Sequence, residues 1–365
     1  MIDQRIEKFA QQLINSVGLC PGENILIETT DTPPEMTSAL VWAATSRMAK
    51  PIVHIYDSEV QKTFIVTASR EAKEAVAARA LSEMKDMQAY IAVRGAKNAF
   101  DMAYIPDPVA AEYKAIMNPV TRYRVDHTKW CVTRWPNASM AQAAGMPTVD
   151  FEDYFFNACL VDYTEMARKA QPLVDRMNKA KEVHIVANGT DLVFSIEGMP
   201  AIPCCGEKNI PDGEVYTAPV RDSVNGVITF NTPTMYLGKP FSNIRLEFKD
   251  GKIVNASCES GDQKALDTIL DTDEGARYIG EFAMGLNENV TKTMRDILFD
   301  EKIAGSIHFT PGNAYQDAWN GNKSAIHWDL VLIMRPEYGG GCVWFDDKAV
   351  LVDGKLVDED INQQE

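Results

Sequence analysis

Apolar positions in the first half of the chain follow two different spacings. Ile6, Phe9, Leu13 and Val17 recur every three or four residues, which is typical of an amphipathic helix, here ending near Gly18. Short apolar runs follow, and such runs are typical of buried strands. We predict strands at residues 24–28, 51–56, 89–93 and 130–133.

The segments between these runs have the character of helices. We expect Thr32 to cap a helix that has Pro33 at its first position and continues past Leu40. Residues 68–86 are rich in Ala, Glu and Lys, which favour helix by intrinsic propensity. Strands that alternate with helices predict an α/β domain with a mostly parallel sheet covered on both faces.

The pattern changes near residue 180, after a predicted connecting helix over residues 163–181. Asn-Gly and Asp-Gly pairs, the strongest local signal of a hairpin turn, occur only after this point. They are Asn188-Gly189, Asp212-Gly213, Asn225-Gly226, Asp250-Gly251, Asn320-Gly321 and Asp353-Gly354. The second half is therefore predicted to be mostly antiparallel β (α+β), with one clear helix over residues 273–282. We place the domains at 1–180 and 181–365.

One stretch of the second domain, residues 301–329, carries an unusual combination of side chains. His327 and Asp329 flank Trp328, and an apolar run follows them, so a strand is expected. Side chains at i and i+2 of a strand share a face, which would direct the imidazole and the carboxylate the same way. His308 lies in a second alternating stretch. Two imidazoles and a carboxylate suit a borderline divalent cation, although structural histidines are the plain alternative.

Composition narrows the function classes. The 365 residues carry a formal net charge of −16 and no window of about 18 apolar residues, so we expect neither nucleic acid nor a membrane as partner. The first residues are charged throughout and do not resemble a signal peptide. The seven cysteines form no C-x-x-C pair, which favours reduced thiols and a cytoplasmic location.

Several common motifs are missing from the sequence. No dinucleotide fingerprint, Walker A loop or nucleophile elbow follows a predicted strand. His54 lies in the middle of a strand and His184 in a predicted hairpin, and we interpret both as structural. His127 lies in a polar loop without an evident partner.

Three glutamates complete the candidate set. Glu214 follows a turn and enters a strand, Glu281 lies at the end of the predicted helix, and Glu301 leads into the strand of His308. Each by itself would be read as a solvated surface glutamate. Together with the histidines they make a set of carboxylates and imidazoles.

This set resembles the M29 metallo-aminopeptidases, the aminopeptidase T and aminopeptidase S type. The resemblance covers most of the chain and is most specific in the second half, at residues 190–192, 209–219, 276–281, 299–301, 314–315 and 327–329, together with His308. It implies that Glu214, Glu281, Glu301, His308, His327 and Asp329 bind metal, and that Tyr315 is an active-site tyrosine. The spacing from Glu301 to His308 is longer than is typical of the family, and that from Tyr315 to His327 is shorter.

The resemblance implies a metal-dependent aminopeptidase that hydrolyses the N-terminal peptide bond of small peptides with a free N-terminus. It would use two divalent ions per chain (Zn, Co or Mn) about 3.5–4 Å apart, bridged by a carboxylate, to activate a water. Glu281 is expected either to carry a proton to the leaving amine or to bind metal. Tyr315 would donate to the oxyanion. A homodimer is also implied.

Two alternatives stay open. The first is a mononuclear non-haem Fe(II) ring-cleaving dioxygenase of the same superfamily, with His308, His327 and Asp329 as its facial triad. The second is a non-catalytic relative that binds a small ligand or a metal. Metal analysis separates the first alternative from the peptidase, and failure to hydrolyse any aminoacyl amide when fully loaded would favour the second.

Overall fold

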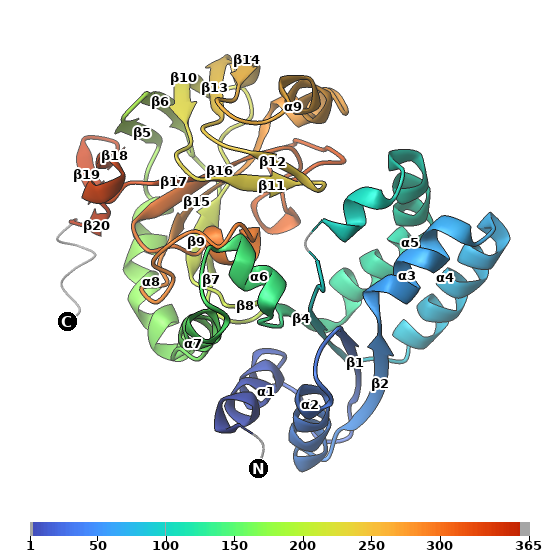
Figure 1. Cartoon of the computed structure of the whole chain (residues 1–365). Coiled ribbons are helices and arrows are strands. Elements are labelled where there is room, and N and C mark those ends of the chain that lie inside the picture. Colours follow the sequence, from blue (N-terminus) through green and yellow to red (C-terminus); the bar gives the residue numbers. More distant parts are fainter. Residues whose placement is uncertain (1–2, 99, 358–365) are drawn as a thin grey trace. The chain divides into compact units, whose positions relative to one another are not determined.

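The computed structural model describes residues 3–98 and 100–357 and divides into two units (Figure 1). The first unit contains the chain up to Leu160 together with Gly206–Pro211, and the second contains Val161–Cys205 and the chain from Asp212 onward. This division differs from the predicted boundary at residue 180. Helix α8 (Tyr163–Met177) packs in the core of the second unit through Leu173 and Met177, so it is not a free connector.

Parallel strands form the sheet of the first unit, in the order β2-β1-β3-β4-β8. Their bounds are β1 (Asn24–Thr30), β2 (Lys50–Tyr56), β3 (Ala89–Arg94), β4 (Lys129–Arg134) and β8 (Asn209–Ile210). The helices of this unit are α1 (Gln4–Ser16), α2 (Pro34–Ser46), α3 (Ser58–Thr67), α4 (Arg70–Met84), α5 (Asp107–His127), α6 (Ala138–Ala143) and α7 (Thr148–Cys159), with a 3₁₀ helix η1 (Asp101–Tyr104).

Helices cover both faces of this sheet, as predicted. Leu26 of β1 packs in one apolar cluster with Ala77 of α4 and Val120 of α5. The strand pleat turns the buried Ile25 and Ile27 to the opposite face, and α2 contacts β1 there beside α1. The predicted parallel α/β fold of this half is therefore confirmed.

Local differences from the sequence prediction concern helices. Helix α2 begins at Pro34 with Pro33 as its N-cap, one residue later than predicted, and Thr32 lies before the cap. Helices α3 and α5 were not predicted. His127 is the last residue of α5, so the prediction of a polar loop there was wrong.

Two antiparallel sheets dominate the second unit, with orders β14-β13-β10-β6-β5-β18-β19-β20 and β17-β16-β15-β9-β7. Their bounds are β5 (Glu182–Ala187), β6 (Thr190–Ser195), β7 (Ile202–Cys204), β9 (Glu214–Thr217), β10 (Asn225–Thr229), β13 (Arg245–Lys249), β14 (Lys252–Ser257), β15 (Ile279–Gly285), β16 (Ser306–Pro311), β17 (Leu330–Ile333), β18 (Gly341–Phe345), β19 (Lys348–Val352) and β20 (Lys355–Leu356). A two-stranded ribbon pairs β11 (Thr234–Tyr236) with β12 (Lys239–Phe241). The remaining helices are α9 (Gln263–Leu270), α10 (Ile297–Asp300), η2 (Glu274–Arg277), η3 (Gln316–Ala318) and η4 (Pro336–Tyr338).

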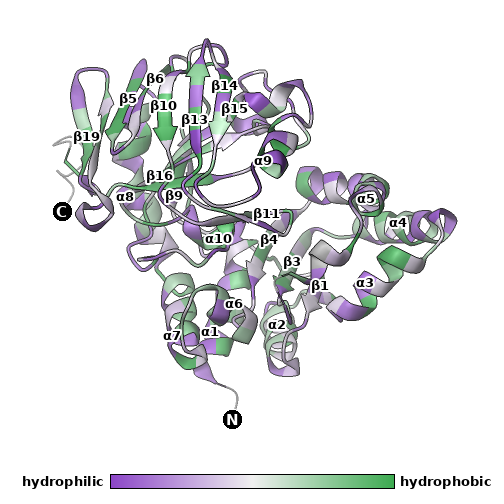
Figure 2. Ribbon diagram, turned by 45° about the horizontal axis from the view of Figure 1, so that its top comes forward, coloured by the Kyte–Doolittle hydropathy of each residue, from purple (hydrophilic) through white to green (hydrophobic). Residues whose placement is uncertain are grey.

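The apolar core of this unit joins the two sheets. Phe194 of β6 contacts Phe282 of β15 and Phe309 of β16, with ring centroids 5.1 Å apart in each case. Hydrophobic stretches follow strands such as β5 and β16 in Figure 2. The predicted, mostly antiparallel second half is confirmed.

The predicted helix over residues 273–282 was wrong. Only a 3₁₀ turn, η2, forms there, and the following residues make strand β15. All seven residues of β15 are buried. Strands β9 and β16 pair with its two edges, and Phe282 and Met284 pack in the apolar core on one of its faces. Gly275 and Gly280, which lie inside the predicted helix, also disfavour helix. The helix of this region is α9, which lies earlier in the chain.

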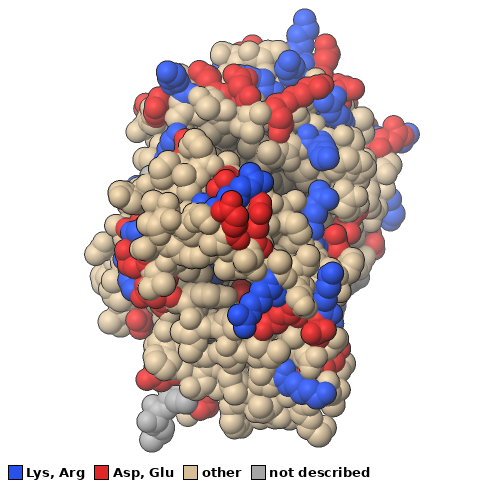
Figure 3. Space-filling model, turned by 90° about the vertical axis from the view of Figure 1, so that its right-hand side faces the viewer, with Lys and Arg blue, Asp and Glu red and all other residues tan. Residues whose placement is uncertain are grey.

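Two surface and covalent features complete the description. Among the described residues, no helix is both long and apolar enough to cross a membrane, and no disulfide joins two cysteines. On the face drawn in Figure 3, acidic and basic side chains lie interspersed, without a broad patch of one sign.

Candidate metal centre

In one sheet of the second unit, the candidate residues and the core residues lie on opposite faces. Val215, Phe282 and Phe309 point into the apolar core between the sheets. Their neighbours Glu214, Glu281 and His308 therefore point to the other face, because successive side chains of a strand alternate. The strands β9, β15 and β16 are adjacent, so three residues far apart in sequence meet on one face.

The segment from His327 to Asp329 follows the same rule. Trp328 is buried against Tyr236 and Phe241, with ring centroids 4.8 and 5.3 Å away. His327 and Asp329 project together on the opposite side, as predicted. The segment is extended but precedes β17, and His327 forms an isolated bridge with Gly312 of the neighbouring chain segment.

These side chains form two groups of three. In the first group, His308 Nε2 lies 3.1 Å from Glu281 Oε1 and 3.5 Å from Glu214 Oε2. In the second group, His327 Nε2 lies 3.4 Å from Glu281 Oε2 and 3.2 Å from Asp329 Oδ1. The ligand atoms within each group all lie within 4.8 Å of one another. Glu281 belongs to both groups and presents one oxygen to each histidine.

Neighbouring polar groups hold the second group in place. His327 Nδ1 lies 2.8 Å from the carbonyl oxygen of Asn313, which orients the ring with Nε2 toward Asp329. The hydroxyl of Thr310 donates to Asp329 Oδ1 at 2.7 Å. A Cβ atom at Gly280 would lie 2.3 Å from the same Asn313 carbonyl, so only glycine lets this loop approach β15 so closely.

Several polar atoms of the centre make no hydrogen bond. Glu214 Oε2, Glu281 Oε2 and His308 Nδ1 are buried and accept or donate no hydrogen bond within the described part of the chain. Leaving such atoms unsatisfied is costly, and a carboxylate oxygen is a metal ligand. The donor set of imidazole nitrogens and carboxylate oxygens fits zinc-like divalent ions.

Neighbouring carboxylates raise the pKa of both histidines. Burial works to lower the pKa of His308, but the hydrogen bond with Glu281 and the charge of Glu214 outweigh it and raise the pKa to about 9. Burial is likewise outweighed at His327, where Asp329 raises the pKa to about 10. Protons thus occupy, in the metal-free chain, the atoms that an ion would take.

Comparison with known proteins decides the family. The model of the family described as thermophilic metalloprotease (M29) matches residues 2–337, which is nearly the whole chain. The chain belongs to the M29 family.

Several relatives of this M29 chain are named aminopeptidases. It is 26% identical to aminopeptidase PepS of Streptococcus thermophilus over 386 residues, covering 90% of this chain and 92% of that protein. It is 34% identical to aminopeptidase T of Thermus thermophilus over 175 residues, covering 41% and 42% of the two chains. The predicted family and the predicted class of enzyme, a metal-dependent aminopeptidase, are confirmed.

Solved structures agree on the fold. AmpT of Thermus thermophilus superposes with a TM-score of 0.81 at 23% identity and covers 98% of this chain and 100% of its own. A 2,5-dihydroxypyridine dioxygenase of Pseudomonas putida superposes with a TM-score of 0.60 at 14% identity, with 98% of each chain covered. At these identities both likenesses concern the fold alone.

Glu301 is the one predicted ligand that the structure does not bring into either group. It caps the C-terminus of α10, and its Oε1 lies 2.7 Å from the ammonium of Lys302. The same ammonium lies 2.7 Å from Glu214 Oε1 and 3.4 Å from Asp212 Oδ1. Sequence reasoning missed Lys302, because adjacent lysine and glutamate residues usually indicate an ion pair at the solvent-exposed surface.

Tyr315 lies beside the second group. Its ring centroid is 4.6 Å from that of His327. Tyr315 is 48% exposed, so part of its side chain stays in water. Partial loss of hydration against the acidic centre, with the charges of Glu281 and Asp329, raises its pKa above the ordinary value, so the hydroxyl keeps its proton.

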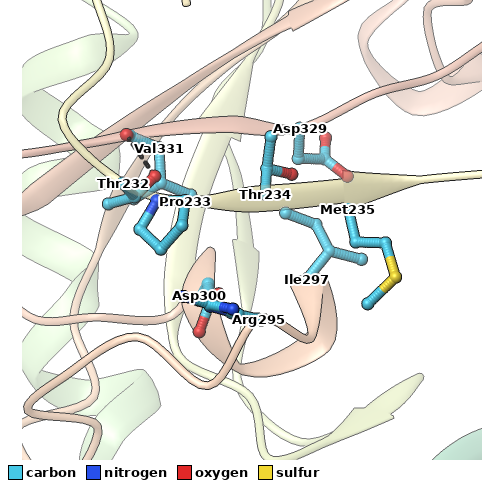
Figure 4. Close-up of a pocket in the computed structure, with 9 residues that line it drawn as sticks. All are labelled: Thr232, Pro233, Thr234, Met235, Arg295, Ile297, Asp300, Asp329 and Val331. Carbon is cyan, nitrogen blue, oxygen red and sulfur yellow. Dashed lines mark hydrogen bonds between the residues drawn. The ribbon is translucent and has the colours of Figure 1, made fainter. Parts of the chain in front are cut away.

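A small cavity adjoins Asp329 (Figure 4). Its walls come from residues 232–235 and from Arg295, Ile297, Asp300 and Val331. The volume is about 10 Å³, close to the space that a single water needs. The cavity is therefore too small to hold a residue of a peptide substrate.

Proposed function

We propose that this aminopeptidase removes N-terminal residues from small peptides with two divalent ions, one in each group. The observation that carries the proposal is Glu281, whose two oxygens face His308 and His327 separately. A carboxylate shared in this way is what two neighbouring cations require to offset their mutual repulsion. Of the two roles expected for Glu281, this geometry supports the metal ligand.

Charge balance supports two ions rather than one. Five carboxylates surround the centre, namely Asp212, Glu214, Glu281, Glu301 and Asp329, and Lys302 is the lysine among them. With neutral imidazoles the formal charge is minus four, which two divalent ions would neutralise. A single ion would leave a net negative charge of one even if the other imidazole kept its proton, and uncompensated buried charge is unfavourable.

The roles of the residues follow from their positions. Bound divalent ions would acidify a water and polarise the scissile carbonyl. Tyr315, which keeps its proton, is placed to donate to the oxygen of that carbonyl as charge develops. Asp212 and Glu301 both stand outside the two groups, and we assign the proton transfer toward the leaving amine to Glu301, whose pKa burial raises to about 8. Acids around the centre also suit a cationic peptide N-terminus.

The grouping does not favour the iron alternative. A facial triad would need His308, His327 and Asp329 around one ion. No candidate group among the described residues combines these three, because His308 belongs with Glu214 and Glu281. We therefore keep the dinuclear peptidase with zinc, cobalt or manganese as the proposal.

Metal titration of the purified metal-free chain by calorimetry tests the number of ions. Two ions per chain are expected, and loading should bring hydrolysis of aminoacyl-p-nitroanilides. Glu214→Gln disables only the first group and Asp329→Asn only the second, so each variant should retain one ion. A wild-type stoichiometry of one, with Glu214→Gln unchanged in metal content and activity, would leave the iron oxygenase ahead.

Assembly is a separate part of the proposal. The family resemblance implies a homodimer, and the expected light-scattering mass at micromolar concentration is that of two chains. A mass of one chain would contradict it. The cytoplasmic location stays a prediction from the cysteine content.

A further inference from the structure

Lys302 is an unusual residue in an acidic metal centre. Its side chain is 1% exposed, and its ammonium contacts carboxylates of Asp212, Glu214 and Glu301. Burying an ammonium is costly unless it is paired, and three carboxylates compensate it here. The proposed aminopeptidase mechanism gives this cation no task.

The ammonium occupies a third group of potential ligands. Cys204, Asp212 and Glu214 present a thiol sulfur and two carboxylate oxygens within 4.8 Å of one another. Cys204 pairs with Glu214 across strands β7 and β9. Lys302 Nζ lies 2.7 Å from Glu214 Oε1 and 3.4 Å from Asp212 Oδ1, so it already pairs with two of the three ligands of this group.

We propose that Lys302 is a positioning residue that serves as a permanent cation in this third group. It excludes a metal ion from Cys204, Asp212 and Glu214, and it turns Glu214 toward the first group. This inference rests on the proposed function, because it assumes that the first group binds metal.

The geometry of Glu214 shows how the positioning works. Lys302 takes Oε1, while Oε2 remains without a hydrogen bond and lies 3.5 Å from His308 Nε2. One oxygen is thus fixed by the ammonium and the other is presented to the ion. Without the ammonium, Glu214 would be free to turn toward the thiol side and to bind an ion there.

The backbone of Lys302 is held firmly. Its carbonyl oxygen accepts from the N–H of Asn287 at 3.0 Å. A Cβ atom at Gly285 would lie 2.2 Å from the carbonyl oxygen of Ile303, so the chain after Lys302 passes directly against β15. Gly285 is also the register partner of Glu214. The ammonium therefore reaches Glu214 from backbone that is hydrogen-bonded to Asn287 and packed against β15.

Cobalt titration tests the proposal, because a thiolate bound to Co²⁺ gives a charge-transfer band in the near ultraviolet. The wild-type chain should bind cobalt without this band. Lys302→Met keeps the length of the side chain and removes its charge, so it should bind one additional ion per chain and show the band. The double variant Lys302→Met/Cys204→Ser should lose the band.

Two results would overturn the proposal. One is a thiolate band in the wild-type chain, which would place metal in the third group despite Lys302. The other is a folded Lys302→Met chain, judged by circular dichroism, that binds the same number of ions as the wild type without a band.

A further variant keeps the test decisive if Lys302→Met does not fold. Cys204→Ser in the otherwise native chain should bind as many ions, and as tightly, as the wild type. Loss of an ion in Cys204→Ser would refute the exclusion of metal from the third group. The number of ions bound by the first two groups is a separate result. One ion in the wild type would contradict the dinuclear function. The Lys302 proposal is judged instead by the additional ion and the thiolate band of the Lys302→Met variant.

Discussion

Each unit of this protein places a histidine on a strand among carboxylates, yet the two clusters differ in how their polar atoms are satisfied. In the parallel-sheet unit, Glu28 accepts hydrogen bonds from Tyr56 and Tyr90, one on each oxygen. His54 Nδ1 meets the Tyr56 hydroxyl at 3.2 Å, and Nε2 lies 3.3 Å from Glu83. The tyrosines and the second glutamate complete this cluster without any ion.

In the antiparallel unit the cluster is left incomplete. Oxygens of Glu214 and Glu281 and a nitrogen of His308 are buried without hydrogen bonds. His54 and Glu28 are each about a third exposed, whereas the side chain of His308 is 1% exposed. The comparison teaches that a histidine beside a carboxylate is not a metal site by itself. Burial with unsatisfied ligand atoms distinguishes the candidate metal centre from the cluster around His54.

Replacing Glu281, the ligand that both groups share, should have the largest effect. Glu281→Gln removes a charged ligand from both groups, so both ions should be lost. Removing an outer partner of a metal ligand costs about 10–100-fold in affinity or activity, and loss of the shared ligand should exceed that. Metal analysis and aminoacyl-p-nitroanilide hydrolysis check the result. The matched control is Glu28→Gln, which should leave the metal content unchanged; equal loss in both variants would contradict the comparison.

A second pair of variants compares the tyrosines of the two clusters. Tyr315→Phe removes a proposed oxyanion donor and should lower kcat by about 10²–10³-fold, with little change in thermal stability. Tyr90→Phe removes a hydrogen bond to Glu28 and should lower stability while leaving kcat unaltered. Steady-state kinetics and thermal unfolding of both variants check this. An unchanged kcat in Tyr315→Phe would remove that residue from the mechanism.

Removing the metal should make the stability of the protein depend on pH, because His308 and His327 can then titrate. At ion concentrations of 100 times Kd, each bound ion stabilises the native state by about 2.7 kcal/mol, which chelation would remove. In the metal-free chain, the pKa values of His308 and His327, about 9 and about 10, exceed the ordinary unfolded value of about 6.5. Their stabilising contribution is therefore complete below pH about 6.5 and is lost as the pH rises through the folded values.

Thermal unfolding from pH 6 to pH 10 measures this effect. The metal-free chain should lose stability over that range, while the loaded chain should lose less, because ions bind the neutral imidazoles better as the pH rises. The variant His327→Gln should show a smaller slope in its metal-free form. A slope identical to that of the wild type would show that His327 does not titrate as described.

The smallest effect is expected in the satisfied cluster. His54→Gln removes contacts with Tyr56 and Glu83 at a partly exposed position, so the cost should be about 1 kcal/mol of unfolding free energy. Chemical denaturation measures it. The number of bound ions should stay at the wild-type value, and loss of an ion would mean that the two clusters are not independent.

Several elements of the fold follow from local sequence patterns, and these were predicted correctly. The apolar runs of β1, β2, β3 and β4 were found with boundaries close to those of the structure. Failures occurred where long-range pairing overrides local preference. The segment that becomes β15 contains a helix-like start, but two neighbouring strands pair with it along both edges and hold it extended.

The candidate residues divide in the same way. Glu214, Glu281, His308, His327 and Asp329 were all named from the sequence, and a period of two correctly placed His327 and Asp329 on one side of Trp328. The sequence by itself thus determined which side chains are candidates for the chemistry, because strand alternation and ligand type are properties of short segments. Tertiary structure decided their partners: it gave one oxygen of Glu281 to each histidine and set Glu301 apart. It also buried Lys302 among acids, because these contacts join segments up to about a hundred residues apart that meet only when the sheet forms.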